Sequence, residues 1–171
     1  MSSVKVVGYC GPIGSGKDYE AKKLIEKEKY VQINFADPLL EDLWAMLRWV
    51  PLTHEDYEKF KNMKINDGQT GRDLIKNFGE TMKNLHGKEY WILKWQKKIY
   101  SLMAKGHKKF VVSDVRFEKD FHMIKIFDGK IFFTRHESEK FYINRQAESE
   151  KIAVMLYDKD IKHLEEITNF F

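Results

Sequence analysis

The sequence predicts an α/β protein in which a five-stranded parallel sheet lies between two layers of helices, formed as one domain of 171 residues. Two observations predict this class. Short runs rich in β-forming residues alternate with longer segments of helical periodicity, which is the pattern of parallel strands joined by crossover helices. A glycine-rich loop at residues 11–16 also stands between the first apolar run and the first helical segment.

Composition and start signals predict the first elements. Residues 4–9, VKVVGY, form a short apolar run that predicts a buried strand, and a helix is expected over residues 17–27. Residues 30–36, YVQINFA, are rich in β-formers and predict the second strand. Asp37 and Pro38 resemble an N-cap followed by proline at the first helical position, so the next helix is expected to begin there.

The middle of the chain is predicted to be helical, with a short helix flanked by loops within residues 51–69. Thr70, with Asp73 three residues later, resembles a capping box, and apolar residues recur behind it at helical spacing. A longer helix is expected over residues 88–105. Its apolar stripe is expected to pack in the core and contains Trp91, Trp95 and Ile99.

Alternation of strands and helices then returns. Residues 108–114, KKFVVSD, predict the third strand, which is apolar beyond its lysines. Residues 118–127 fit a short helix, and residues 130–135, KIFFTR, predict the fourth strand. In a parallel sheet of this kind, the third strand and its neighbours are expected to lie beside the first strand.

The C-terminal segment is expected to complete the sheet. Residues 145–153, RQAESEKIA, are helical in composition, and the apolar run VMLY at 154–157 is expected to form the fifth strand. A closing helix is expected over residues 160–170. No repeat, low-complexity segment or domain linker interrupts the chain, which supports the expectation of one domain.

Composition excludes several classes of protein. The net charge of +4 is mild, and most lysines stand beside acidic residues, so the charge favours anionic small molecules without pointing to nucleic acid. Cys10 is the one cysteine, which rules out a disulfide framework and favours a reducing compartment. The N-terminal apolar stretch is too short for a signal peptide, and no window reaches the roughly 18 apolar residues of a membrane span. We therefore expect a cytoplasmic protein without a membrane partner.

The segment GPIGSGKD at residues 11–18 carries the strongest functional signal. The spacing G-x-x-x-x-G-K, after a strand and before a helix, is that of a phosphate-binding loop, in which backbone N–H groups and the helix N-terminus bind phosphate. A glycine turn beside a surface lysine is the weaker alternative. The candidate nucleotide-binding residues are Gly11, Ile13, Gly14, Ser15, Gly16 and Lys17.

Asp18 stands where such a loop normally has the Ser or Thr hydroxyl that ligates magnesium. A carboxylate beside several phosphate charges is repelled, so we expect Mg²⁺ to lie between them, held by Asp18 directly or through a water. The alternative is a negative charge in the first helical turn, favoured by the helix dipole. Asp114, at the end of the predicted third strand, is the second candidate metal ligand. Arg116 follows it, and an ion pair between these two is the alternative there.

Arg72, Lys76 and Lys83 form the polar side of the predicted helix that follows Thr70, and Arg72 and Lys76 are its candidate acceptor-site residues. They lie on its polar side, and a planar guanidinium suits a phosphate or a carboxylate bidentately. A basic face that is merely solvated is the alternative. That alternative applies to Lys76 more than to Arg72, which stands in the first helical turn.

Arg135 and Arg145 bracket a polar segment, HESEKFYIN, that fits either a mobile lid or a plain surface loop. As a lid over about residues 135–147, it would bring both arginines onto a transferring phosphoryl group. On that interpretation Arg145 joins Lys17 and Arg116 as a candidate catalytic residue, and Arg135 is a candidate for nucleotide binding.

Four segments stand out in chain order: GPIGSGKD, INFADPL, TGRDLIKNFGE and VVSDVRFEKD. Together with the late segment ESEKIA, they resemble the phage-type deoxynucleoside monophosphate kinases over essentially the whole chain. The resemblance implies a phosphate-loop nucleoside monophosphate kinase fold with an acceptor-binding helical region at about residues 37–105. It implies transfer of the γ-phosphoryl group of ATP, with Mg²⁺, to a deoxynucleoside 5′-monophosphate. The family is largely viral, which would place the protein in host cytoplasm.

By motif, the resemblance implies that Lys17 and the loop glycines bind ATP phosphates. It places Asp37 and Arg72 in the acceptor site, and Asp114 and Arg116 near the metal and the phosphates. The form GKD is the family's own. A phosphate monoester has a second pKa near ~6 and is largely a dianion at pH 7, so such an enzyme needs positioning and charge neutralisation rather than a strong base.

Several alternatives stay open. Lys76 stands where the family commonly has glutamine, Asn84 where it has arginine and Tyr19 where it has threonine. The resemblance therefore names neither the preferred nucleobase of the acceptor nor the contacts that surround the metal ligands. A phosphate-loop kinase acting on a hydroxyl, similar to dephospho-coenzyme A kinases, would use Asp37 as its base. A nucleotide-binding regulator without transfer activity is a further alternative, and a nucleic-acid-binding protein is favoured only by the basic pI. A homodimer is also left open.

Overall fold

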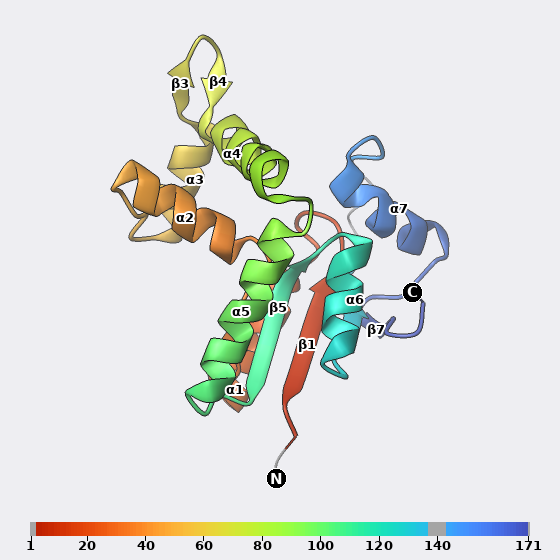
Figure 1. Cartoon of the computed structure of the whole chain (residues 1–171). Helices are drawn as coiled ribbons and strands as arrows, with labels where there is room; N and C mark the ends of the chain where they lie inside the picture. The colour runs from red at the N-terminus through yellow and green to blue at the C-terminus, as the bar shows by residue number, and fades with distance from the viewer. Residues whose placement is uncertain (1–2, 137–142, 171) are drawn as a thin grey trace. The chain divides into compact units, whose positions relative to one another are not determined.

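The computed structural model describes residues 3–136 and 143–170, which form an α/β architecture (Figure 1). The chain divides into two units. The first runs to Phe35 and resumes at Ile99, and it contains a five-stranded sheet. The second, Ala36–Lys98, contains helices and a two-stranded sheet. None of the helices in the described ranges combines the length and apolar character needed to cross a bilayer.

The sheet of the first unit has the order β2-β5-β1-β6-β7. β1 (Lys5–Cys10) lies between β5 (Lys109–Val115) and β6 (Lys130–Phe133) and is parallel to both. β2 (Val31–Gln32) pairs parallel with β5, whereas β7 (Glu165–Glu166) pairs antiparallel with β6. The sheet is therefore mixed and mostly parallel, and the expectation of five parallel strands is wrong for the last strand.

Helices cover both faces of this sheet because the strand side chains alternate between the faces. Tyr9 of β1 belongs to an apolar cluster with α1 (Lys17–Glu28), which packs on β1, β2 and β5. Gly8, on the opposite face, lies against Ile124 of α6 (Glu118–Ile126), and α6 packs on β1 and β6. The unit thus agrees with a three-layer α/β/α arrangement.

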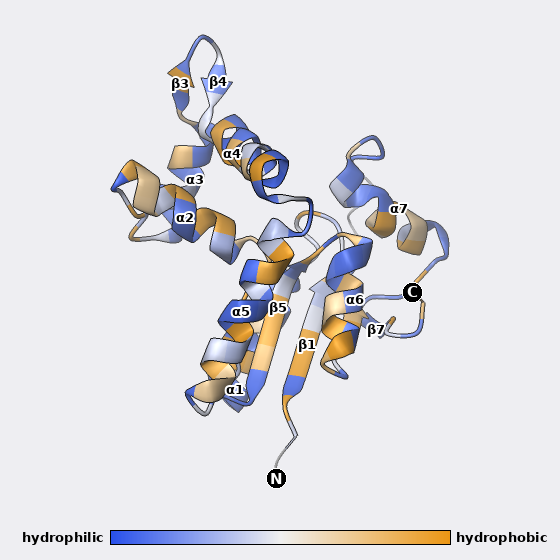
Figure 2. Ribbon diagram, in the orientation of Figure 1, coloured by the Kyte–Doolittle hydropathy of each residue, from blue (hydrophilic) through white to orange (hydrophobic). Residues whose placement is uncertain are grey.

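Figure 2 colours parts of β1 and β5 as hydrophobic, as expected of strands that are covered on both faces. Side chains from the strands and from α6 form the centre of the core. Those that are fully buried include Phe110, Phe121, Ile124, Ile131 and Phe133.

The expected fifth strand at residues 154–157 is wrong, because these residues lie within α7 (Lys151–Asp158). Ala153 and Leu156 are both buried, and their spacing of three residues places them on one face of a helix. A four-residue apolar run fits a strand or a buried helix equally, so the sequence could not decide between them. The preceding segment is a 3₁₀ turn, η1 (Glu148–Glu150), rather than an α-helix.

The closing helix expected over residues 160–170 is also wrong. Asp160 and Leu164 have φ angles of 55° and 53°, which interrupt helical backbone. The chain instead runs along the sheet edge, where Ile167 N–H donates to Ile131 O at 2.7 Å. Ile167 is fully buried there, so its apolar side chain stabilises an edge strand instead of a helix.

The second unit contains the helices expected in the middle of the chain. Their bounds are α2 (Asp37–Leu47), α3 (His54–Asn62), α4 (Gly71–His86) and α5 (Tyr90–Ala104), whose last turns belong to the first unit. The capping box at Thr70 is confirmed, since Thr70 Oγ1 accepts from Asp73 N–H and Asp73 Oδ2 accepts from Thr70 N–H. The N-cap of α2 is Ala36, so the expectation that Asp37 caps this helix is wrong by one residue.

A hairpin, β3 (Lys64–Asn66) with β4 (Gln69–Thr70), lies where only loops were expected. Asp67 and Gly68 form its turn with φ angles of 40° and 85°. Positive φ at both central residues is typical of a two-residue hairpin turn, and Asp-Gly is a preferred pair for it. The sequence therefore contained the signal for this hairpin.

The strand expected over residues 30–36 is shorter than predicted, because only the two residues of β2 are in strand.

Gly71→Ala is expected to destabilise the second unit by more than about 2 kcal/mol. The new Cβ atom would lie 2.0 Å from the backbone oxygen of Phe60, which cannot move without disturbing the end of α3. Gly79→Ala in the same helix is the control. Its Cβ would come closest to the flexible end of Leu39, at 2.7 Å, and alanine is the better helix former by about 1 kcal/mol.

Urea unfolding followed by tryptophan fluorescence measures both variants, because all four tryptophans lie in this unit. Equal losses for the two variants would contradict the steric argument at Gly71.

Candidate phosphate-binding site

The loop between β1 and α1 depends on three glycines whose φ angles are 153° at Gly11, 82° at Gly14 and 90° at Gly16. These values are unfavourable for residues with a side chain. At Gly11 there is also no room, because an added Cβ would lie 2.3 Å from the backbone oxygen of Thr134, just beyond β6. The backbone of the loop is therefore pressed against the end of β6.

Ser15 anchors this loop through a buried side-chain hydrogen bond. Its side chain is fully buried, and its Oγ lies 2.7 Å from Thr134 Oγ1. Thr134 N–H in turn donates to Cys10 O at 2.8 Å, which extends the parallel pairing of β1 and β6 to the base of the loop. The side chain of Ser15 is thus an anchor, while the neighbouring Ile13 is exposed. Thr134 was not among the predicted site residues, because only the register of β6 places it here.

Lys17 begins α1, and its side chain folds over the loop. Its Nζ donates to Gly11 O at 2.7 Å and to Pro12 O at 2.6 Å. Burial, followed by the positive charge of Arg116, lowers the pKa of Lys17. This cause also shows that the Arg116 guanidinium lies within electrostatic reach of Lys17. The charges of these two predicted residues therefore act on each other.

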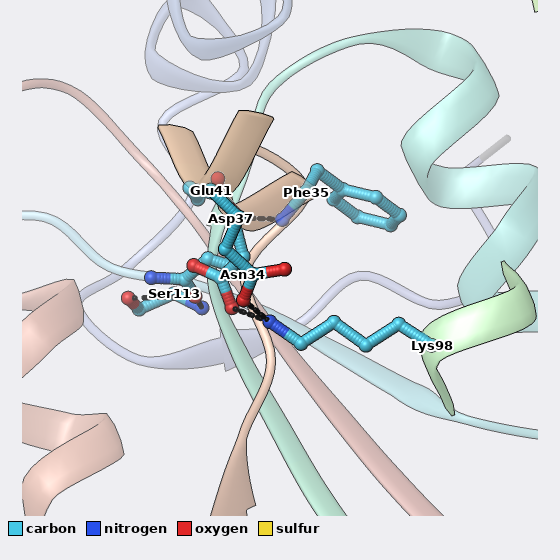
Figure 3. A network of polar contacts seen from close by, with 7 residues as sticks. Asn34, Phe35, Asp37, Glu41, Lys98 and Ser113 are labelled. Atoms are coloured by element: carbon cyan, nitrogen blue, oxygen red, sulfur yellow. Dashed lines mark hydrogen bonds and ion pairs between the residues drawn. The ribbon is translucent and has the colours of Figure 1, made fainter. Parts of the chain in front are cut away.

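Asp18, the second residue of α1, is exposed and bonds to β5 rather than to its own helix. Its Oδ1 accepts a hydrogen bond from Ser113 Oγ at 2.7 Å. Ser113 has two further partners, one in β2 and one in the segment that follows it. Gln32 Nε2 donates to its Oγ at 3.0 Å, and Asn34 Oδ1 accepts from its N–H at 2.9 Å. Figure 3 shows Asn34 beside Ser113. Sequence reasoning missed all three partners of this network.

Asp114 follows Ser113 on β5, and its Oδ1 accepts from Phe35 N–H at 2.8 Å. This bond ties the end of β5 to the segment after β2. Of the two predicted metal ligands, Asp18 contacts Ser113 and Asp114 contacts the backbone of Phe35, so the two carboxylates have separate partners. Within the described residues, no three His, Cys, Asp or Glu side chains gather closely enough to hold a metal ion on their own.

Asp120 positions the backbone of Arg116. Its Oδ2 accepts from the N–H groups of Arg116 and Phe117 at 3.0 and 2.9 Å. Asp120 is buried, and burial raises its pKa from 3.8 to about 6 against the effect of these hydrogen bonds. Burial likewise raises the pKa of the Cys10 thiol to about 12, so this cysteine is not a nucleophile at neutral pH.

Both arginines of the expected lid are paired with carboxylates. Arg135 Nη1 donates to Asp160 Oδ1 at 3.1 Å, and its guanidinium lies 3.9 Å from the ring centre of Tyr157. Arg145 pairs with Asp158 at 3.3 Å. The structure thus places both near α7 and the turn after it. The expected lid over residues 135–147 lies partly outside the described residues.

The predicted acceptor residues Asp37, Arg72 and Lys76 belong to the second unit. Arg72 and Lys76 are exposed one turn apart on α4. Asp37 Oδ2 lies 3.4 Å from Lys98 Nζ, and Lys98 also bonds to Glu41. Figure 3 shows the Lys98 side chain reaching toward these carboxylates. Asp37 is therefore engaged by an ammonium group within its own unit.

No protein-family model matches this chain, and a search of curated proteins finds no significant match. The resemblance to deoxynucleoside monophosphate kinases accordingly stays a prediction from sequence.

The raised pKa of Asp120 gives a pH dependence that can be measured. Because the folded state binds the proton more tightly, this group's contribution to stability is present below about pH 4 and is lost as pH rises through about 6. The loss amounts to about 3 kcal/mol. Asp120→Asn, whose amide oxygen can still accept both N–H groups, is expected to lack this decline.

Urea unfolding from pH 4 to pH 7 compares the two proteins. Asp128→Asn, at an exposed turn of the same unit, is the control and should follow the wild type. Parallel pH profiles for wild type and Asp120→Asn would show that burial does not perturb this carboxyl group.

Proposed function

We propose that the protein is a phosphotransferase that moves the γ-phosphoryl group of ATP to the phosphate of a deoxynucleoside 5′-monophosphate. The observation that carries the proposal is the geometry of the loop from Gly11 to Lys17. Its glycines adopt positive φ, its lysine folds over it, and it joins the central strand β1 to the N-terminus of α1. This is the arrangement in which backbone N–H groups and a helix dipole bind phosphate.

The cations at the loop suit the donor phosphates. Lys17 donates to two carbonyl groups, which leaves one of its three N–H donors for a ligand. Arg116 adds a second charge within electrostatic reach. Both groups would stabilise negative charge on the phosphoryl group during transfer.

The residues beside the loop fit a magnesium ion that arrives with ATP. Asp18 and Asp114 offer carboxylate oxygens, which are the ligands that hard cations prefer. One or two carboxylates together with substrate phosphates and waters form the usual Mg²⁺ site in such enzymes, so a larger cluster is not required. When bound, the ion supplies charge neutralisation at the β- and γ-phosphates.

The acceptor needs positioning more than activation. Its phosphate is largely dianionic at pH 7, so one of its oxygens attacks the γ-phosphorus while the bond to the bridging oxygen of ADP breaks. The products are ADP and a deoxynucleoside diphosphate. We assign binding of the acceptor phosphate to Arg72, whose guanidinium is exposed on α4.

The same reasoning disfavours a hydroxyl acceptor. Such a kinase would need Asp37 as a general base. The ion pair of Asp37 with Lys98 fits a structural or binding role better than that of a group which must accept a proton.

Incubation with ATP, Mg²⁺ and a panel of acceptors tests the proposal. ADP is expected to form with one or more deoxynucleoside monophosphates, and not with hydroxyl acceptors alone. Lys17→Ala should reduce turnover by at least about a hundredfold, since one charged donor at a transition state is worth this much, without loss of secondary structure by circular dichroism. Lys22→Ala, an exposed lysine of the same helix, should stay active. Turnover by folded Lys17→Ala would refute the assignment of the loop.

Arg72→Lys separates acceptor binding from donor binding. Losing a bidentate charged hydrogen bond is expected to raise the KM for the deoxynucleoside monophosphate about tenfold to a hundredfold, with little change in the KM for ATP. Lys83→Ala is the control on the same helix, because Lys83 pairs with Glu80. Equal changes in both KM values would place Arg72 outside the acceptor site.

A further inference from the structure

The residue after the loop lysine is Asp18, which has no hydroxyl group. A hydroxyl group from another element, that of Ser113, nevertheless contacts its side chain. Ser113 of β5 lies 2.7 Å from Asp18 Oδ1, and only 3% of Ser113 is exposed. Asp18 therefore has a fixed partner although it is itself exposed on α1.

The direction of each hydrogen bond follows from the groups present. The Gln32 amide can only donate to Ser113 Oγ, at 3.0 Å, so the hydroxyl proton of Ser113 points elsewhere. Asp18 Oδ1 at 2.7 Å is a closer acceptor than Asn34 Oδ1 at 3.3 Å. Asn34 Oδ1 already accepts from Ser113 N–H. The bonds thus form a chain that runs from Gln32 through Ser113 to Asp18.

This chain leaves one carboxylate oxygen of Asp18 for a ligand. Within the described residues, Oδ1 accepts from Ser113, and Asp18 Oδ2 has no hydrogen bond. A carboxylate that served only as a helix-terminal charge would not need a buried donor from β5. The hydroxyl holds the carboxylate in one rotamer, which lowers the entropy lost when a cation or its water binds.

We propose that Ser113 is a positioning residue for Asp18, orienting its carboxylate so that the second oxygen meets the magnesium ion or a water bound to it. The inference rests on the proposed function, because it assumes that Asp18 faces the metal of a bound nucleotide. Ser113 itself is buried, accepts from Gln32 and donates its proton to Asp18, and the proposal gives it no direct contact with the ion. The missing loop hydroxyl is thus replaced by two residues, a carboxylate on α1 and a hydroxyl on β5 that aligns it.

Mn²⁺ binding to the complex with ADP, measured by the loss of the free-ion signal in electron paramagnetic resonance, tests this role without turnover. Ser113→Ala is expected to weaken Mn²⁺ binding about tenfold, as is typical when a partner of a metal ligand is removed. ADP affinity measured by calorimetry without metal should stay unchanged. Ser113→Thr retains the hydroxyl and should bind Mn²⁺ nearly as the wild type does.

A double variant shows whether Ser113 acts through Asp18. In the Asp18→Asn background, Ser113→Ala should cause little further loss of Mn²⁺ affinity. Gln32→Met leaves the hydroxyl in place and should cause a smaller loss than Ser113→Ala. Ser101→Ala, an exposed serine of α5, is the control for melting temperature and metal binding.

Full additivity of the two changes, or unchanged Mn²⁺ binding by Ser113→Ala, would overturn the positioning role while leaving the metal role of Asp18 intact. Unchanged Mn²⁺ binding by Asp18→Asn would overturn both the positioning role and the metal part of the proposed function. Unchanged ADP binding by Lys17→Ala would instead refute the loop assignment, so the failures are distinguishable.

Discussion

The close approach of the Gly11 backbone to the Thr134 carbonyl is the constraint on which the candidate site depends. The pairing of β1 with β6 continues through the bond from Thr134 N–H to Cys10 O, and this brings the next residue of the chain against β6. Only glycine fits there. Ser15 then bonds to Thr134 from the far side of the loop. These contacts fix where the loop turns, and so they fix where Lys17 starts α1.

Two buried carboxyl groups lie close enough to the cations of this loop to interact with them electrostatically. Asp120 holds the backbone of Arg116, and Glu150 is 5% exposed with its Oε2 unpaired among the described residues. Burial raises the pKa of Glu150, while the charges of Lys17 and Arg116 act in the opposite direction. These acidic groups therefore offset part of the positive charge at the loop. This agrees with the mild net charge of the chain.

The sequence predicted those features that depend on neighbouring residues. The strand before Gly11, the helix after it and the capping box at Thr70 are each encoded within a few positions. The partner of Asp18 could not be predicted in this way, because Ser113 reaches it through the register of β5 and the packing of α1 on the sheet. Residues 154–157 were misassigned for a related reason, since only their burial in the fold distinguishes a helix from a strand.

The two edges of the main sheet are both formed by strands of two residues, β2 and β7. Such short edges offer few unpaired backbone groups to another chain. At β7 the residues are Glu165 and Glu166, both exposed, so a second molecule that approached this edge would meet like charges. The charge and shortness of β7 therefore disfavour edge-to-edge pairing of this sheet with another chain.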